Sequence, residues 1–287
     1  MPATASLERK WRFTPGDEIA PGRVALQLLG GGHRFEAYVC WDDRLHGTVV
    51  AKVLRPHLVH QSRSLALLRA EADALQRLQH PVLLRSFGAV LEGPYPHLVL
   101  EHLEGPRLST LVRRFGPLSA EQIVPLAGRL VSALAYLAAE EWVHLDVKPR
   151  NIVMTSVPRL IDLSVARRVG AARAIDHAVG TDAYMAPEQC DASRYAQIGP
   201  PSDVWGLGAT LYEALTGHQA FPADGVDRFP QLRREPPALP PKAPSVMASA
   251  IRACLADDPA ARPTAQELGQ LLEPLGDWSA RAIRRLR

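Results

Sequence analysis

The sequence predicts an α+β protein in which a small β-rich part with one helix precedes a larger, mainly helical part. β-branched runs at residues 48–53 and 97–100 have the composition of strands, and both fall within the first hundred residues. From about residue 108 onward, signals for the start and end of helices dominate instead. A chain of 287 residues is long enough for two such parts.

One helix is predicted inside the β-rich part. Apolar residues recur there with helical spacing, and Glu71 lies beside the apolar stripe. The stripe consists of Leu65, Leu68, Ala72, Leu75 and Leu78.

Three helices are predicted in the second part from residues that cap helix ends. Ser119 followed by Gln122, and Thr264 followed by Glu267, have the pattern of a capping box. Ser202 is a candidate cap for the helix between them. The predicted ends are about Glu140, Gly217 and about Leu272. The stretch 222–244 holds seven prolines, which predicts an extended surface loop and not a separate domain.

These signals divide the chain into four segments. We expect an N-terminal extension at 1–20, the β-rich part at 21–103, the helical part at 104–275 and a basic tail at 276–287. The last seven residues suit an acidic partner, a membrane surface or a solvated helix end, and the helix end is the favoured interpretation.

Composition restricts the class of protein. Hydrophobic residues make up 47% of the chain and charged residues 22%, as in ordinary globular proteins. A net charge of +3 is too small to indicate nucleic-acid binding. The three cysteines are far apart, which favours a reducing compartment. The N-terminus has no apolar core of signal-peptide length, and the apolar run Val131–Ala139 is about half a membrane span. We therefore expect a cytoplasmic protein with no transmembrane anchor.

Residues 144–151 read His-Leu-Asp-Val-Lys-Pro-Arg-Asn, and a further aspartate follows at 162. A carboxylate, an ammonium group, an amide and a second carboxylate at this spacing are the parts that phosphoryl transfer requires. Only four of the 33 basic residues are lysine, and two of the four are Lys148 in this motif and Lys52 in a strand-like run. A compact ammonium suits a single phosphate oxygen better than a planar guanidinium does.

Together with the flanking motifs, these residues resemble the bacterial eukaryote-like (Hanks-type) Ser/Thr protein kinases over about residues 24–273. The resemblance implies a bilobed fold with a small β-rich N-lobe and a larger helical C-lobe. It also implies ATP as phosphoryl donor, Mg²⁺ as cofactor and proteins that present Ser or Thr as substrates.

In the β-rich part the resemblance implies a phosphate-binding turn and a lysine–glutamate pair. Gly30 and Gly32 match the first two glycines of the family's turn. Lys52 follows Gly32 by 20 residues and Glu71 follows Lys52 by 19, which are usual separations for the pair that holds the lysine against the phosphates. The residues matching the adenine-binding positions are Leu29, Ala37, Val50, Leu100, Glu101, Leu103 and Val153, with Leu100 as gatekeeper.

In the helical part the resemblance assigns the chemistry. Asp146 is the catalytic base, Lys148 contacts the γ-phosphate, and Asn151 with Asp162 binds Mg²⁺. Lysine at 148 is the Ser/Thr pattern, as distinct from the tyrosine-kinase one. Further matches are Thr181 near the base, Asp203 beneath the catalytic loop and a Glu188–Arg262 pair.

Three residues depart from the family's pattern: Phe35 replaces the third glycine, Leu145 replaces an arginine, and Ser164 replaces a glycine. The missing arginine normally neutralises a phosphate on the activation loop, and residues 165–180 contain no Ser, Thr or Tyr. The hypothesis that follows is an activity independent of activation-loop phosphorylation.

The sequence therefore predicts a Ser/Thr protein kinase. The alternatives are a pseudokinase scaffold that binds nucleotide or partner proteins, for which the three departures are the evidence, and a small-molecule kinase. The motif Ala186-Pro187-Glu188 and its partner Arg262 disfavour the small-molecule kinase.

Overall fold

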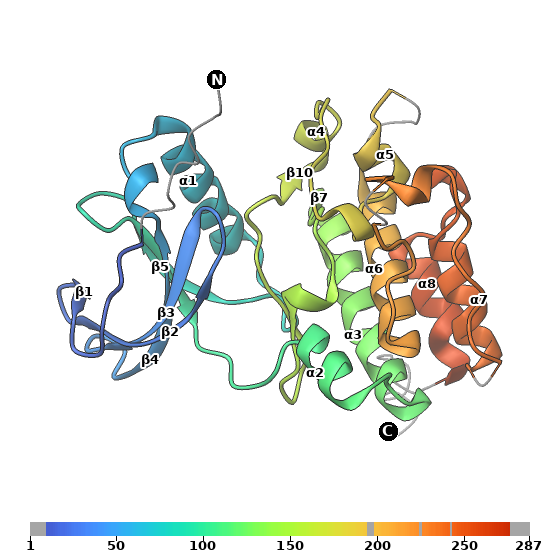
Figure 1. Ribbon diagram of the computed structural model, residues 1–287, viewed down its shortest axis with the longest axis horizontal. Coiled ribbons are helices and arrows are strands. Elements are labelled where there is room, and N and C mark those ends of the chain that lie inside the picture. Colours follow the sequence, from blue (N-terminus) through green and yellow to red (C-terminus); the bar gives the residue numbers. More distant parts are fainter. Residues whose placement is uncertain (1–9, 194–197, 224–225, 242, 276–287) are drawn as a thin grey trace. The chain divides into compact units, whose positions relative to one another are not determined.

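The computed structural model describes residues 10–193, 198–223, 226–241 and 243–275 of the chain. They form two compact units: the first comprises residues 10–79 and 84–104, and the second comprises residues 80–83 and the described residues from 105 to 275. The predicted α+β class is confirmed, since the first unit is built on a sheet and the second is mainly helical (Figure 1).

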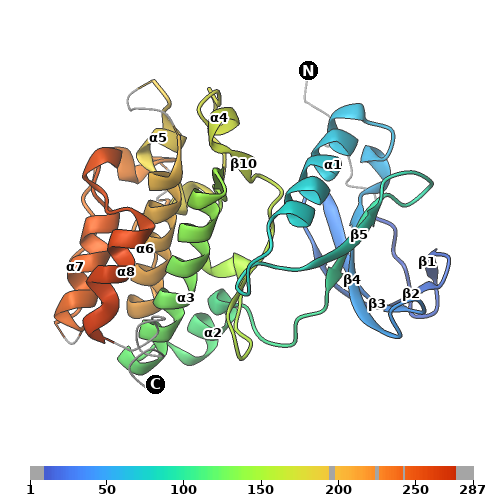
Figure 2. The same cartoon turned by 180° about the vertical axis from the view of Figure 1, so that it is seen from behind.

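The first unit contains a six-stranded antiparallel sheet in the order β1-β2-β3-β4-β6-β5. One helix, α1 (Ser62–Arg77), lies against the sheet, as Figures 1 and 2 show from opposite sides. The strands are β1 (Glu18–Ala20), β2 (Arg23–Gly31), β3 (Phe35–Asp42), β4 (Gly47–Leu54), β5 (Ser86–Val90) and β6 (His97–Glu101).

The two faces of this sheet have different roles. Ala37 pairs with Lys52 across β3 and β4, and Val50 pairs with Leu100 across β4 and β6. Because side chains alternate along a strand, these four residues share one face. The opposite face carries a hydrophobic core formed by Ile19, Ala25, Tyr38, Cys40, Val49, Ala51, Val53 and Val99.

Residues 10–20 differ from the extension predicted for 1–20, whose first nine residues lie outside the described ones. Trp11 and Phe13 pack against the core of the first unit. The ring of Tyr95 meets both of them edge-on, at centroid distances of 4.7 and 5.0 Å. Two aromatic side chains bury enough apolar area to hold a segment that has little regular structure.

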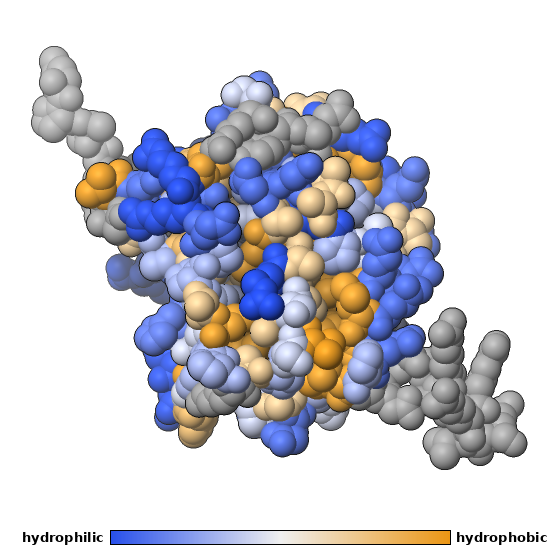
Figure 3. All heavy atoms as spheres, turned by 90° about the vertical axis from the view of Figure 1, so that its right-hand side faces the viewer, coloured by the Kyte–Doolittle hydropathy of each residue, from blue (hydrophilic) through white to orange (hydrophobic). Residues whose placement is uncertain are grey.

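The second unit is formed by α2 (Leu108–Phe115), α3 (Ala120–Ala139), α4 (Val169–Ala172), α5 (Pro187–Cys190), α6 (Pro200–Thr216), α7 (Ser245–Cys254) and α8 (Ala265–Leu272). Two antiparallel ribbons accompany the helices, one of β7 (Trp142–Val143) with β10 (Arg167–Arg168) and one of β8 (Ile152–Val153) with β9 (Arg159–Leu160). Figure 3 looks onto the side that carries α7 and α8, where hydrophobic patches are interrupted by hydrophilic residues.

The helix-end signals at Ser119, Gly217 and Thr264 are confirmed, whereas the one at Ser202 is misplaced. The Ser119 N–H donates to Gln122 Oε1 at 2.9 Å, as in the predicted capping box. The Thr264 hydroxyl accepts from the Glu267 N–H, and Gly217 ends α6 with a left-handed φ of 79°. Ser202 is not the N-cap residue, because α6 begins after Gly199 with two prolines in its first turn; its hydroxyl instead accepts from the Gly199 N–H at 3.3 Å. Proline has the backbone angle that a helix start needs, so the helix begins before the serine.

Among the described residues, α3 is the one helix with the length and composition to cross a membrane. Of its apolar window, 56% is buried within the chain itself. Its buried residues, which include Leu126 and Leu130, belong to the core of the second unit, as in the central helix of a globular domain.

His97 lies in a buried polar network on the first unit's sheet. Its Nδ1 is 2.6 Å from the carbonyl oxygen of Tyr95, and its Nε2 is 2.7 Å from Nη1 of Arg23. Because a carbonyl only accepts and a guanidinium only donates, the ring is neutral with its proton on Nδ1. Burial lowers the pKa of His97 to about 4; the Tyr95 carbonyl opposes this shift, and the charge of Arg23, which also pairs with Asp42, adds to it.

We expect His97→Gln to reduce the pH dependence of stability. The unfolded chain binds a proton at residue 97 as the pH falls below about 6.5, whereas the folded chain resists it down to about 4. The free energy of unfolding therefore falls in this window by up to about 3 kcal/mol through this group. Denaturant unfolding of both proteins between pH 7 and pH 4 measures the difference, and parallel curves would contradict the assignment.

Candidate active site

The first unit brings the predicted lysine and glutamate together. Nζ of Lys52 on β4 donates to both carboxylate oxygens of Glu71 on α1, at 2.7 and 3.0 Å. The side chain of Glu71 is 2% exposed and that of Lys52 is 13% exposed. A largely desolvated pair of this kind holds the ammonium in one position and leaves part of it accessible to an anion.

Phe35, the residue in place of the third glycine, also contacts Lys52. Its ring centroid lies 4.7 Å from the Lys52 Nζ, which is within cation–π distance. The departure at this position therefore adds a contact to the lysine. The sequence offered no signal for it, because residues 35 and 52 meet only through the pairing of β3 with β4.

The glycine-rich turn joins β2 to β3. Gly30 has a φ of +143°, which L side chains rarely adopt. A Cβ at Gly31 would lie 2.9 Å from the carbonyl oxygen of Phe35, whereas one at Gly32 would meet open space. The structure thus gives Gly31 a steric role that the family's motif does not predict, because the motif tolerates any residue at that position.

The residues predicted to contact adenine are divided between the units. Ala37 and Val50 are half-buried on the face of the first sheet that carries Lys52, and Leu100 is 5% exposed. Leu29, on β2, is about half exposed. Glu101 ends β6 and Leu103 follows it in the first unit, while Val153 belongs to β8 in the second.

In the second unit, three side chains converge on Asp146. Lys148 Nζ donates to its Oδ2 at 2.6 Å, Asn151 Nδ2 donates to the same oxygen at 3.0 Å, and Thr181 Oγ1 donates to Oδ1 at 2.7 Å. Lys148 Nζ also donates to the Thr181 hydroxyl. A carboxylate oriented from both oxygens beside an ammonium can accept the proton of a hydroxyl placed there.

The backbone that carries Asp146 is fixed by Asp203 on α6. The two Asp203 carboxylate oxygens accept from the N–H groups of His144 and Leu145, both at 2.7 Å. Burial raises the pKa of Asp203, and these two donors oppose the rise by stabilising the charged form. Leu145 has a φ of +65°, a strained value for leucine, so the loop keeps this shape only with external support.

Asn151 and Asp162 have oxygen donors suited to magnesium. Asn151 uses its Nδ2 in bonds to Asp146, so its side-chain oxygen is directed elsewhere. The N–H of Ile161 donates to the Asn151 carbonyl oxygen at 2.8 Å. Because Asp162 directly follows Ile161, this bond brings the backbone of Asp162 close to that of Asn151. No cluster of three or more His, Cys, Asp or Glu residues suited to a metal occurs in the described part of the chain. One amide and one carboxylate fit Mg²⁺ held partly by substrate phosphates.

Leu145, the residue in place of the usual arginine, is 3% exposed in an apolar cluster with Val143, Ala172 and Ile198. Partly buried residues of the segment 165–179 pack onto the cluster; they are Val165, Val169, Ile175 and Val179. Apolar contacts thus hold this segment against the catalytic loop, where the family's usual arginine would bind a phosphate.

Gln189 links the same two segments with hydrogen bonds. Its Nε2 donates to the carbonyl oxygens of Leu145 at 3.0 Å and Val179 at 2.8 Å. No motif predicted a role for this residue, although it directly follows the predicted Ala-Pro-Glu motif. Gln189 is 3% exposed, and a buried glutamine is a polar group placed for its partners.

Two ion pairs stabilise the segment after Thr181. Arg262 donates to both oxygens of Glu188 at 2.7 and 2.9 Å, as the family resemblance implied. Arg228, from the proline-rich stretch, donates to Asp182 at 2.8 and 3.1 Å. Gln231 adds bonds to the carbonyl oxygens of Asp182 and Met185. The proline-rich stretch therefore supports the segment beside Asp146.

Comparison with known proteins identifies relatives over most of the chain. The family model of the protein kinase domain matches residues 24–271. The chain is 33% identical over 261 residues to the probable serine/threonine-protein kinase PkwA of Thermomonospora curvata, covering 88% of the chain and 34% of that protein. It is 32% identical over 224 residues to serine/threonine-protein kinase PknB of Mycobacterium leprae, covering 75% and 35%.

A third relative is serine/threonine-protein kinase PknA of Mycobacterium tuberculosis, 32% identical over 256 residues, covering 84% of the chain and 58% of that protein. The chain thus spans between about a third and three fifths of the length of these relatives.

We expect Leu145→Ala to loosen the segment 165–179. The substitution leaves a cavity in the apolar cluster and should lower the free energy of unfolding by about 2–5 kcal/mol. Limited proteolysis should then cut this segment faster at a temperature where the protein is still folded. The matched control is Leu126→Ala, at an equally buried leucine of α3 outside the cluster. Equal cutting of both variants would show that the cluster does not hold the segment.

Proposed function

This chain belongs to the protein kinase family, and from that premise we propose that it transfers the γ-phosphoryl group of ATP to serine and threonine hydroxyls of proteins. The observation that carries the proposal is the convergence of Lys148, Asn151 and Thr181 on the Asp146 carboxylate. These contacts leave one carboxylate oriented as a base beside an ammonium, which is what transfer to a hydroxyl requires.

In the proposed reaction, Asp146 accepts the proton of the substrate hydroxyl. The hydroxyl oxygen forms a bond to the γ-phosphorus, the bond from that phosphorus to the β–γ bridging oxygen breaks, and ADP leaves with the electron pair. Lys148 neutralises charge on the transferred group, and Lys52, fixed by Glu71, binds the phosphates of the nucleotide. Asn151 and Asp162 would hold Mg²⁺, which neutralises phosphate charge when bound.

The names of the relatives support serine and threonine as acceptors, because all three are described as serine/threonine-protein kinases. Lys148, two residues after the base, supports the same choice by resemblance. The remaining predicted roles belong to the proposal as well. Gly30 and Gly32 cover the phosphates, and the residues predicted to contact adenine bind the adenine ring. A cytoplasmic location stays a prediction from composition.

Asp146→Asn and Lys52→Met should both abolish most of the activity. The first removes the base and should lower kcat by about 10²–10⁴-fold, and the second removes a phosphate contact and should do comparable damage. Transfer from labelled ATP with Mg²⁺ to a general protein acceptor measures the loss. The matched controls are Asp73→Asn and Lys10→Met, at exposed residues, which should keep full activity. Background labelling by every protein, the unsubstituted chain included, would favour a non-catalytic scaffold.

Activity should not depend on phosphorylation of the segment 165–180. That segment has no hydroxyl side chain, and the apolar cluster around Leu145 already holds part of it in place. The kcat of phosphatase-treated protein should therefore stay within about twofold of that of untreated protein. Loss of a group that stabilises charge in the transition state would lower kcat far more, by about 10³–10⁵-fold. Mass spectrometry before and after treatment identifies any phosphate. Loss of activity together with loss of a phosphate from Ser164 or Thr181 would overturn the hypothesis.

A further inference from the structure

A buried arginine in the first unit is bonded to the glycine-rich turn. Arg55 follows β4, and its side chain is 4% exposed. Its Nε donates to the carbonyl oxygen of Gly32 at 2.7 Å, and its Nη1 lies 3.6 Å from Oε1 of Glu36. Glu36, on β3, is itself 2% exposed. Neither residue belongs to the predicted phosphate-binding or catalytic set.

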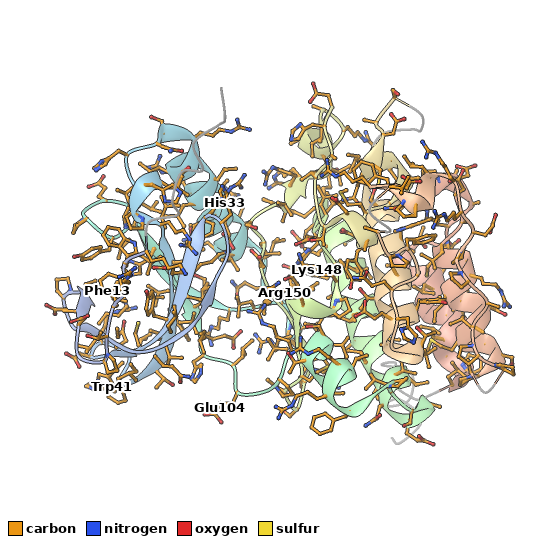
Figure 4. All side chains as sticks on the ribbon, in the orientation of Figure 1. Phe13, His33, Trp41, Glu104, Lys148 and Arg150 are labelled. Atoms are coloured by element: carbon orange, nitrogen blue, oxygen red, sulfur yellow. The ribbon has the colours of Figure 1, made fainter. Side chains whose placement is uncertain are left out.

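The other carboxylate oxygen of Glu36 is held by the N-terminal segment. Oε2 accepts from the backbone N–H of Trp11 at 3.0 Å and from the Tyr38 hydroxyl at 3.1 Å. The indole N–H of Trp11 donates to the Leu54 carbonyl oxygen at 2.8 Å, one residue before Arg55. A continuous polar path therefore runs from Trp11 through Glu36 and Arg55 to Gly32. In Figure 4, Phe13 marks the N-terminal segment and His33 marks the turn.

This path approaches the turn from the face opposite Lys52. Ala37 pairs with Lys52 and shares its face, so the preceding residue, Glu36, points to the other one. Gly31 lies close to the path as well, because a Cβ there would be 3.2 Å from Arg55 Nη2 and 3.3 Å from Glu36 Cγ. A side chain at residue 31 would therefore disturb the packing of Arg55 and Glu36 against the glycine-rich turn.

A buried ion pair is a weak source of stability, because desolvation of the two charges offsets their attraction. What such a pair does provide is a fixed geometry, since each hydrogen-bonding group must keep its partner or lose about 1–3 kcal/mol. Here the group fixed by Arg55 is a backbone carbonyl in the middle of the glycine-rich turn. Glycines leave that backbone free unless something else holds it.

We propose that Arg55, oriented by Glu36 and Trp11, is a positioning residue that fixes the Gly32 carbonyl and thereby the glycine-rich turn in the shape that binds nucleotide phosphates. The proposal rests on the proposed function, in which this turn covers the phosphates of ATP. Arg55 acts through the backbone and does not touch the nucleotide. Its loss should weaken the binding of phosphates and leave the binding of adenosine unchanged.

The test compares ATP with adenosine by calorimetry on the full chain, with Mg²⁺ present for ATP. Arg55→Met should raise the Kd of ATP about 10-fold, the loss expected for one charge-assisted hydrogen bond, and change the Kd of adenosine less than twofold. The matched control is Arg23→Met, which removes another buried arginine of the first unit, paired with Asp42. It should lower the melting temperature without any preference for ATP over adenosine.

Two further variants keep the test decisive if Arg55→Met fails to fold. Arg55→Lys preserves the charge opposite Glu36 but cannot bond to both Glu36 and Gly32, so a selective loss of ATP binding is again expected. Trp11→Phe keeps every charge and the ring packing, removes the bond to Leu54, and should give a smaller selective loss. Equal weakening of ATP and adenosine, or no change in any variant, would overturn the proposal.

The outcomes also separate this proposal from the proposed function. An unsubstituted chain that binds no ATP, or binds it without transferring phosphate, would contradict the function itself. An active unsubstituted chain whose Arg55 variants bind ATP normally would contradict only the role of Arg55.

Discussion

The shape of the catalytic loop depends on one buried carboxylate, that of Asp203. Both of its oxygens accept backbone N–H groups of the loop, and these belong to His144 and to Leu145, the residue with the strained φ. Strained backbone persists only where its surroundings determine it, and a carboxylate in a dry site keeps its charge only where donors surround it. The strained backbone at Leu145 therefore requires the Asp203 carboxylate, and the carboxylate requires the N–H groups of that backbone. Asp146 follows Leu145 directly, so its direction toward Lys148 and Thr181 depends on this mutual support.

Leu145 shows how two kinds of force can hold the same segment. An arginine at this position holds the activation segment by charge, but only after a phosphate has been added to it. A leucine holds the segment by burial, which needs no modification and is not screened by salt. The neighbouring residues agree with the second solution, because Val169, Ile175 and Val179 carry the apolar surface that a leucine can bury. The leucine at this position is therefore matched by the apolar residues that it contacts in this chain.

The sequence predicted the residues whose spacing is set within one loop or by a family motif, such as Asp146, Lys148, Lys52 and Glu71. It could not predict Arg55, Gln189 or Trp11, because each acts through partners that are distant in sequence. In a sequence, a buried arginine or glutamine looks the same as an exposed one. Ser202 is not the N-cap residue for a related reason, since two prolines start α6 earlier than the preference of serine for the N-cap position suggested. A sequence pattern gives the conformational preference of each residue. Where two preferences compete, as those of proline and serine do at the start of α6, the structure shows which one determines the helix start.

The sheet of the first unit separates the proposed phosphate-binding lysine from the residues that support the glycine-rich turn. Lys52 and Phe35 meet on one side, whereas Glu36 and the aromatic residues of the N-terminal segment lie on the other. A phenylalanine in place of the third glycine removes backbone freedom from the end of the turn. The remaining freedom lies in Gly30, Gly31 and Gly32, and Arg55 bonds to the last of these. Because the support reaches the turn through backbone atoms alone, the face that carries Lys52 stays open to an anion, and the turn gains order without placing a second cation beside the first.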